Sequence, residues 1–394
     1  MIVAKKNKRI YFIALLSLAV FLVLKVQRGF TASEEQGGLW NIIQLLYVCM
    51  GLYSCLTLKK RYLQFSMIKS YLAFMFLVWF MSFFVIWSRS NFDIGTLFHF
   101  MTIPYGALCF VFFYDVGLKN DIRKYSYILY FTFIVITCIL FSAQRTYYSL
   151  VLEDKGAIAD VYYIVGLLPI IFIYTPRKLR ILPFLLACIA VMMTGKRTGF
   201  LALATIFILY FLFNDPNERK SFIYRLLFFA IFIITSYLVI IELTESFDLN
   251  MFDRLENLSE DGGSGRAERW KQIWDAFAVD NSILALLVGH GCDSVVELVG
   301  GHAHNDFLEF FYNYGIIVFG LYITLFVSMI RECIKMYKAK FIYAREFMVA
   351  IVISLFLAMF SFYAIDCTYI TCCSVCLGLI LAEWFKYKNE IKYE

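Results

Sequence analysis

The run IYRLLFFAIFIITSYLVIIEL at residues 223–243 is almost entirely apolar and long enough to cross a lipid bilayer. A membrane-spanning helix needs roughly 20 such residues. Similar runs recur along the chain, in which 61% of the 394 residues are hydrophobic and 17% are charged. A soluble domain has about 45–50% apolar and about 25% charged residues. The composition therefore excludes a soluble enzyme, a disordered regulator and a disulfide-stapled secreted domain, and it predicts a polytopic membrane protein.

About twelve apolar stretches of this kind can be marked along the chain. They lie near residues 10–27, 39–58, 70–87, 95–114, 126–143, 158–174, 181–194, 199–213, 226–243, 307–330, 347–364 and 369–385. We therefore predict an all-α membrane protein with about 12 transmembrane helices. The seventh and eighth stretches are short and share the turn at residues 195–199, which predicts tilted or partly re-entrant helices.

Lysine and arginine are distributed unevenly between the two sets of loops. Short cytoplasmic loops are enriched in these residues. Basic clusters occur at residues 59–69, 119–124, 177–180, 219–225 and 331–345, whereas the intervening loops are acidic or mixed. This pattern predicts that both termini are cytoplasmic. The net charge of +6 then reflects topology and gives no reason to invoke nucleic acid.

One loop differs from the others in length and charge. It separates the ninth and tenth stretches on the predicted outer side and holds three of the four histidines. From Glu245 to Asp306 there are 12 acidic and 4 basic residues. Long loops are usually functional or disordered. We predict three parts: helices 1–9 in residues 1–243, a large, partly helical outer loop with the working elements in residues 244–305, and the last three helices in residues 306–394.

The first candidate site in this loop begins at a glycine-rich segment, residues 262–265, which leads into Arg266. An apolar stripe at helical spacing follows: Trp270, Ile273, Trp274 and Phe277. A helix N-terminus with a guanidinium in its first turn can hold a phosphate group. The alternative is a surface helix that lies at the membrane interface and is anchored by its tryptophans.

The second candidate site contains the three histidines of the loop. Residues 289–293 read GHGCD, and residues 300–306 read GGHAHND. A histidine with a pKa near 6.5 at the outer membrane boundary can take a proton from a hydroxyl group. Two alternatives stay open. The histidines could serve only as structural hydrogen-bonding groups, or a zinc ion could bind to His290, Asp293, His302 and His304, although the sequence has no paired metal-binding motif there.

Further polar residues lie near the predicted outer ends of the spans. Three follow at i, i+3 and i+7 on the entering tenth helix, namely Asp306, Glu309 and Asn313, and Asp366 occupies the turn between the last two helices. Ionisable groups at membrane depth are costly and are functional candidates by default. Lys196 and Arg197 lie on the outer side against the basic trend, which indicates an anionic ligand or, alternatively, contacts with lipid headgroups.

These motifs resemble those of the bacterial O-antigen ligase and polysaccharide polymerase superfamily. The resemblance rests on the turn MTGKRTG at residues 193–199, GRAERW at 265–270, GHG at 289–291, and HNDFLE at 304–309 followed by Gly315. It covers about residues 191–320, and the order of the elements also fits. Two positions depart from the family pattern: Val318 stands where a second glycine is common, and Lys196 stands where a small residue is common.

The resemblance implies a GT-C-like helical fold in the bacterial inner membrane and a metal-independent, inverting glycosyltransferase that needs no cofactor. The donor would be a glycan on undecaprenyl diphosphate in the outer leaflet. The acceptor would be another lipid-linked glycan for a repeat-unit polymerase, which we favour, or lipid A-core for an O-antigen ligase. Membrane lipids and a chain-length regulator are the further partners. A non-enzymatic transporter of lipid-linked oligosaccharides is the alternative from another class, although the spans offer few charges to line a cavity.

The resemblance also implies a role for each candidate residue. His304 matches the family histidine and would act as the general base. Four cations would hold the diphosphate: Lys196, Arg197, Arg254 and Arg266. The residues that would orient the acceptor or the base are His302, Asn305, Asp306, Glu309 and Asp366. Positioned cations are needed because the departing diphosphate gains negative charge.

Overall fold

The computed structural model describes residues 8–28, 38–88, 100–120, 126–138, 161–176, 179–194, 196–209, 265–280, 282–361, 364, 367–391 and six helical positions between 227 and 241. Within these residues all regular structure is helical, without a β-strand. They form two compact units. The first comprises Met1–Ile13, Gly38–Lys124 and Glu260–Glu394, and the second comprises Ala14–Gly37 and Tyr125–Ser259.

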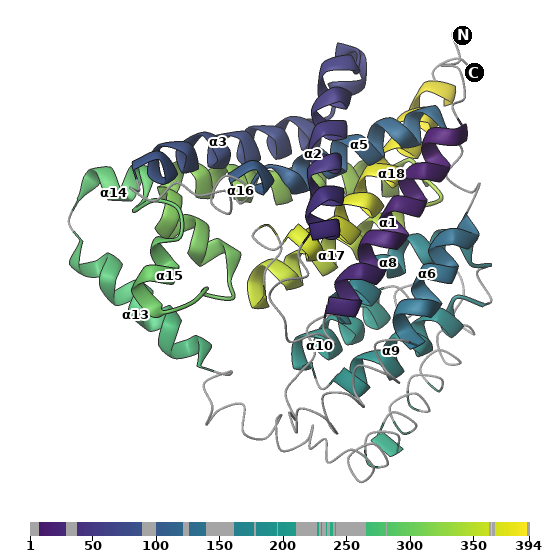
Figure 1. Cartoon of the computed structure of the whole chain (residues 1–394). Coiled ribbons are helices and arrows are strands. Elements are labelled where there is room, and N and C mark those ends of the chain that lie inside the picture. The colour runs from purple at the N-terminus through teal and green to yellow at the C-terminus, as the bar shows by residue number, and fades with distance from the viewer. Residues whose placement is uncertain are drawn as a thin grey trace. The chain divides into compact units, whose positions relative to one another are not determined.

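The first unit contains most of the described helices (Figure 1). Its elements are α2 (Gly38–Thr57), the short 3-10 helix η2 (Lys60–Leu63), α3 (Ser66–Ser88), α5 (Tyr105–Lys119), α13 (Arg266–Val279), α14 (Ile283–Val288), α15 (Ser294–Val299), α16 (Asp306–Lys338), α17 (Ala344–Phe360) and α18 (Cys367–Ile391). The helix α1 (Lys8–Arg28) starts in this unit and continues into the second.

Helices α5 and α18 form the most closely packed pair of the first unit. A Cβ atom added to Gly378 would lie 2.7 Å from the carbonyl oxygen of Phe110, and one added to Gly117 would lie 2.7 Å from the Cβ of Ala382. Small residues let apolar helices approach closely when no hydrophobic effect drives them together in lipid. The pair is also joined by a buried hydrogen bond of 2.8 Å between the hydroxyls of Tyr105 and Thr371.

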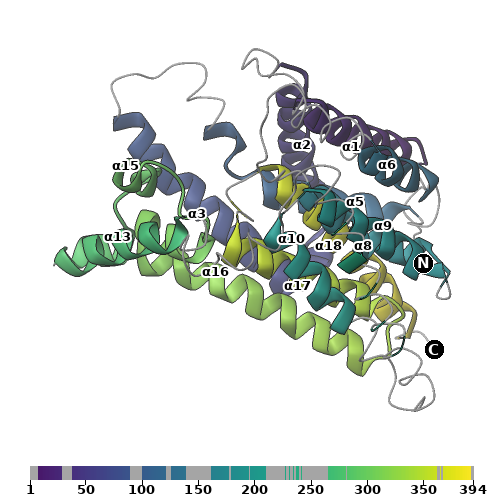
Figure 2. The ribbon, with the colours of Figure 1, turned by 90° about the horizontal axis from the view of Figure 1, so that it is seen from below.

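Helix α16 is the longest of the described helices, and the shorter helices α13, α14 and α15 pack at its N-terminal end (Figure 2). It packs along α3 through aromatic rings, with Phe74 of α3 4.9 Å from both Phe310 and Tyr322. A buried hydrogen bond of 2.8 Å joins Ser82 of α3 to Tyr314. These contacts with α3 therefore hold the first part of α16, against which α13, α14 and α15 pack.

The second unit holds α6 (Ser126–Cys138), α8 (Val161–Tyr174), α9 (Ile181–Thr194) and α10 (Arg197–Phe207). Helix α8 is buried along nearly its whole length. Helices α9 and α10 are 14 and 11 residues long and are joined by a short turn, as the sequence predicted for the seventh and eighth stretches. A Cβ atom at Gly199 would lie 3.3 Å from Val191, so this glycine allows the two helices to meet closely just after the turn.

The predicted apolar stretches largely coincide with helices where the structure describes them, and one of them is interrupted. In the fourth stretch, predicted at residues 95–114, residues 100–102 are helical, residues 103–104 form a turn, and α5 runs from Tyr105 to Lys119. Pro104 occupies the N-cap position of α5. Proline has no N–H to donate and clashes with the preceding turn inside a helix, so the long helix starts after it.

Three of the described helical segments are long and apolar enough to cross a membrane, namely Ser66–Val85, Asp306–Lys338 and Ile370–Glu390. The other apolar helices in the described ranges are shorter, such as Val161–Tyr174 and Thr198–Phe207. The all-helical fold class is therefore confirmed, while the count of about twelve spans stays a prediction.

Candidate functional site

A break in α16 at Gly315 organises the candidate site. Gly315 has φ 71° and ψ −174°, which is not helical, although the helix continues on both sides. The break frees carbonyl groups that would otherwise accept bonds from the next turn. The backbone N–H of His290 donates to the oxygen of Tyr312 at 3.1 Å, and that of Gly291 donates to Asn313 at 2.8 Å. The segment GHG therefore caps the kink.

Glycine is required on both sides of this contact. A Cβ atom at Gly289 would collide with the backbone of Asn313, and one at Gly315 would lie 2.5 Å from the carbonyl oxygen of Leu287. Both glycines also have positive φ, which L-residues rarely adopt. Two motifs that the sequence separates by more than twenty residues are thus one structural element.

The His290 ring belongs to this cap. It stacks on Tyr312 at 4.1 Å between ring centroids, and its Nδ1 lies 3.1 Å from the Tyr312 carbonyl oxygen. Its Nε2 lies 2.8 Å from Oδ2 of Asp280. The pKa of Asp280 is lowered because the Ser282 N–H and the His290 ring bond to its carboxylate. Among the described residues, no three His, Cys, Asp or Glu side chains are placed to share a metal ion.

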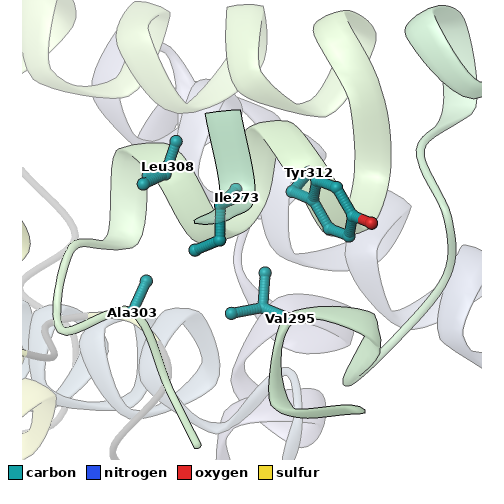
Figure 3. Packing of buried hydrophobic residues seen from close by; sticks show 5 residues of the cluster. All are labelled: Ile273, Val295, Ala303, Leu308 and Tyr312. Atoms are coloured by element: carbon teal, nitrogen blue, oxygen red, sulfur yellow. The ribbon is translucent and has the colours of Figure 1, made fainter. Parts of the chain in front are cut away.

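Helix α13 packs its predicted apolar stripe against residues 300–306, which are called the histidine segment below. Ile273 is buried in a cluster that Figure 3 shows between α13, α15 and α16, with Val295, Ala303, Leu308 and Tyr312. Trp270 and Phe277 pack at the edge of this cluster, while Trp274 is largely exposed. The stripe therefore forms a small core. The alternative of a helix at the membrane interface, anchored by its tryptophans, stays a prediction.

Two side chains of α13 hold the backbone of the histidine segment. The indole N–H of Trp270 donates to the carbonyl oxygen of Ala303 at 2.7 Å. From the preceding residue, Nη1 of Arg269 donates to the carbonyl oxygen of His302 at 3.1 Å. Sequence analysis did not single out Arg269 as a site residue, although its i+3 spacing from Arg266 places both guanidinium groups on the same side of the helix.

His302 and Glu309 form a short charged pair. Nδ1 of His302 lies 2.6 Å from Oε1 of Glu309, and Oε2 of Glu309 accepts the N–H of Ala303 at 3.1 Å. The Glu309 side chain is only 2% exposed, and a buried carboxylate needs such partners. The Glu309 bond raises the pKa of His302 above its ordinary value, although burial of the ring acts in the opposite direction. The pair therefore favours a cationic imidazole beside a buried carboxylate.

His304 occupies a strained position directly before α16. Its φ is 55°, one of three positive values among the described non-glycine residues. The left-handed region costs an L-residue roughly 1–2 kcal/mol and is typical of functional sites when the surroundings enforce it. Asn305 follows directly, and its side-chain oxygen accepts the Leu308 N–H at 3.1 Å and caps α16.

The predicted polar row on α16 is buried, and each member ties down a different segment. Oδ2 of Asp306 accepts the Tyr322 hydroxyl at 2.9 Å and the Ala364 N–H at 2.7 Å. Oδ1 of Asn313 accepts the N–H of Val295 at 3.0 Å. With Glu309, the row therefore holds the α17–α18 connection, the histidine segment and α15 against α16.

Arg266 is the first residue of α13, as the sequence predicted, and follows Gly265 with φ 74°. Its Nη1 donates to the carbonyl oxygen of Phe360 at 2.6 Å. That carbonyl belongs to the last residue of α17, where the helix dipole favours a cation. Since Asp306 binds the nearby Ala364 N–H, both side chains reach the connection between α17 and α18.

The remaining predicted residues belong to the second unit or lie outside the described residues. Lys196 precedes α10 in the second unit, with its Nζ 5.9 Å from the centroid of the Tyr162 ring. Arg197 begins α10, and its side chain lies outside the described residues, as do Arg254 and Asp366.

A comparison with known families was decisive for the class of protein. Residues 182–323 match a model of the family described as O-antigen ligase. Over these residues the chain is similar to the O-antigen ligase family, which supports the superfamily that the sequence resembles. No curated protein matches the chain.

The superfamily match contains the elements that form the site. It runs from α9 through α13, α14 and α15 into α16 beyond Gly315, and it includes the range predicted at residues 191–320. Together with the apolar helices, it supports a membrane protein of polysaccharide biosynthesis. The class predicted from the sequence is confirmed at this level.

Proposed function

We propose that the chain is a repeat-unit polymerase that transfers a glycan from undecaprenyl diphosphate to a lipid-linked acceptor. One observation carries the proposal. Inside the stretch that matches the O-antigen ligase family, the strained His304 follows the His302–Glu309 pair at the end of a helix long enough to span a membrane. An imidazole at the outer membrane boundary is suited to activate a sugar hydroxyl.

The proposed reaction is a single displacement with inversion. His304 takes the proton of the acceptor hydroxyl as that oxygen bonds to the anomeric carbon of the donor. The bond from this carbon to the diphosphate oxygen breaks, and the electron pair leaves with the diphosphate. Arg266 would exchange its bond with the Phe360 carbonyl for the phosphate oxygens, where a guanidinium binds in two-pronged fashion. Arg197, Arg254 and Lys196 would complete the anion site.

The other site residues would position these groups. Glu309 fixes the His302 ring and the Ala303 N–H, so the backbone that leads into His304 is held from both sides. Asp306 holds the α17–α18 connection, where Asp366 would reach the acceptor. Asn305 caps α16 and thereby maintains the conformation of His304. The His302–Glu309 pair also has the geometry of a base with its orienting carboxylate, so the test must separate the two histidines.

The proposal includes a membrane layout. About twelve spans in a GT-C-like arrangement would place both termini in the cytoplasm and the site on the outer face of the bacterial inner membrane. The coincidence of the predicted stretches with helices supports this layout. The acidic loop at residues 244–305 would lie outside, where lipid-linked donors are presented.

The second candidate is an O-antigen ligase, because the matching family carries that description. Glycan analysis of a deletion strain distinguishes the two. Loss of a polymerase leaves single lipid-linked repeats, and lipid A-core carries one repeat at most. Loss of a ligase leaves long lipid-linked polymer and bare lipid A-core.

Complementation of the deletion strain tests the catalytic assignment. His304→Ala should be expressed normally and yet lose about 10²–10⁴-fold in transfer rate. His302→Ala should lose less. A larger loss in His302→Ala than in His304→Ala would assign the base to His302. Normal chain lengths in both variants would contradict a transferase that uses these histidines and would favour the transporter.

A further inference from the structure

The short helix α14 presents an unusually apolar surface. Ile283 is 75% exposed and Leu284 is 68% exposed, and Leu286 and Leu287 are exposed as well. These four residues are called the α14 face below. The helix contains no charged side chain. A contiguous apolar surface of this kind marks a site that contacts another apolar phase.

The nearest acidic side chain is already engaged within the protein. Asp280 accepts the N–H of Ser282 at 2.8 Å through Oδ1 and faces the His290 ring at 2.8 Å through Oδ2. It therefore directs its carboxylate into the kink cap. On α13, the exposed charged residues follow one another at helical spacing on the side opposite to the apolar stripe, namely Glu268, Lys271 and Asp275. These described charged side chains of α13 therefore lie away from its apolar stripe, and α14 itself carries none.

Helix α16 has an exposed apolar stripe that begins at the same place. Its members recur at spacings of three, four and seven residues, which marks one face of the helix: Ile316, Ile323, Val327, Ile330 and Ile334. In a helix that spans a membrane, such a stripe is the surface that lipid covers. The last turn of α16 carries Lys335 and Lys338.

The length of this stripe sets the depth of α14. From Ile316 to Lys335 a helix rises about 28 Å. The hydrocarbon layer of a bilayer is about 30 Å thick. With the lysines at the inner boundary, the outer boundary therefore falls near Gly315 and Ile316. The carbonyl end of α14 packs at this level, because a Cβ on Gly315 would meet the carbonyl of Leu287.

We infer that α14 is immersed in the outer leaflet, with the α14 face among lipid acyl chains and continuous with the lipid-covered stripe of α16. Interfacial helices bury their apolar side about 5–10 Å into the boundary between headgroups and chains. Trp274, largely exposed on α13, would lie at the headgroup level, where tryptophan is enriched. The occupant of the α14 face is bilayer lipid. This inference requires α16 to span the membrane and does not depend on the proposed reaction.

Photocrosslinking tests which molecule covers the α14 face. The full chain carries p-benzoylphenylalanine at Leu284, or at the exposed polar position Gln272 of α13 as the matched control, and is reconstituted in vesicles of phosphatidylethanolamine and phosphatidylglycerol. We expect phospholipid adducts at Leu284 at least severalfold above those at Gln272, measured by mass spectrometry of the peptides. Equal adducts at both positions, or a crosslink from Leu284 to a second copy of the chain, would overturn the inference.

A second measurement keeps the test independent of that substitution. A fluorescent amino acid at Ile283 should be quenched by lipids that carry a nitroxide on the acyl chain near the glycerol, and less by a water-soluble quencher. The reverse order would place α14 in water. The vesicles contain no glycan donor, so a negative result in this assay is separate from a failure of the proposed reaction.

Discussion

Buried carboxylates occur at both ends of the first unit, and they are bonded in different ways. At the end that carries Lys335, a buried carboxylate pairs with a lysine one turn away on the same helix, with Lys119–Asp115 at 2.6 Å and Lys335–Glu332 at 2.5 Å, and the partly exposed Glu383 pairs with Lys386 at 2.6 Å. At the histidine end, Asp306 and Glu309 bind backbone N–H groups, a tyrosine hydroxyl and an imidazole from other segments.

The different partners indicate different roles: the lysine pairs neutralise carboxylates, whereas the bonds at the histidine end shape the candidate site. A lysine pair within one helix neutralises a carboxylate locally. Asp115 and Glu332 each accept one further bond from another helix, from the Ser54 hydroxyl at 3.3 Å and the Trp384 indole N–H at 3.4 Å. At the histidine end, Asp306 and Glu309 bind backbone N–H groups, and Glu309 also holds an imidazole whose pKa it raises. Only this end therefore combines defined geometry with adjustable charge, as acid–base chemistry requires.

Within this comparison of the two ends, the largest expected loss of transfer rate concerns Arg266 at the histidine end. Arg266→Ala should reduce glycan transfer roughly 10- to 150-fold, since a lost bond to a charged group costs about 1.5–3 kcal/mol. Arg266→Lys should not restore the rate, because an ammonium cannot reproduce the two-pronged geometry. Initial rates in vesicles with a lipid-diphosphate donor measure the effect. Arg331→Lys, exposed near the other end of α16, is the control and should stay near wild type.

A matched pair of carboxylate variants tests the comparison itself. Glu309→Gln removes the charge that holds His302 and should lower the transfer rate about tenfold or more, the value of one charged hydrogen bond. Glu332→Gln removes a carboxylate that is equally buried but paired with Lys335. It should leave the rate unchanged and alter only thermal stability. Equal rate losses in the two variants would show that the carboxylates at both ends are structural.

The smallest effect is a pH dependence of stability. Because the folded pKa of His302 is raised, its pairing with Glu309 stabilises the protein fully below the unfolded pKa of about 6.5 and is lost as the pH rises through the higher folded value. The melting temperature of the wild type should fall by a few degrees at most over this range. In His302→Gln the fall should be smaller.

An identical fall in wild type and His302→Gln would locate the titrating group elsewhere. A fall that also disappears in Glu309→Gln would assign it to the pair.

Much of this arrangement was predictable from local sequence patterns. The apolar stretches gave the helices, and Asp306, Glu309 and Asn313 were correctly placed on one face of a helix that begins at Asp306. The start of α13 at Arg266 followed from the glycines before it and the apolar stripe after it. These features depend on helical periodicity, which neighbouring residues carry.

The partners of the polar groups were not predictable, because they come from other segments. The sequence placed Glu309 next to the histidines without showing that it binds His302. His290 was grouped with His302 and His304, whereas its ring caps the kink beside Tyr312. The turn at residues 103–104 was missed because the apolar pattern of the fourth stretch outweighed Pro104.

Because of the kink at Gly315, the segment from His304 to Gly315 has a fixed number of residues between two fixed ends. One end is fixed by the contact with Leu287 and the capping of Tyr312, and the other end is fixed by the cap at Asn305. Each helical residue advances the chain by about 1.5 Å and rotates it by about 100°. A single inserted residue would therefore swing Asp306 and Glu309 away from their partners while leaving composition and hydropathy almost unchanged. We therefore expect an insertion or deletion in this segment to disrupt the site more than a substitution of an exposed residue.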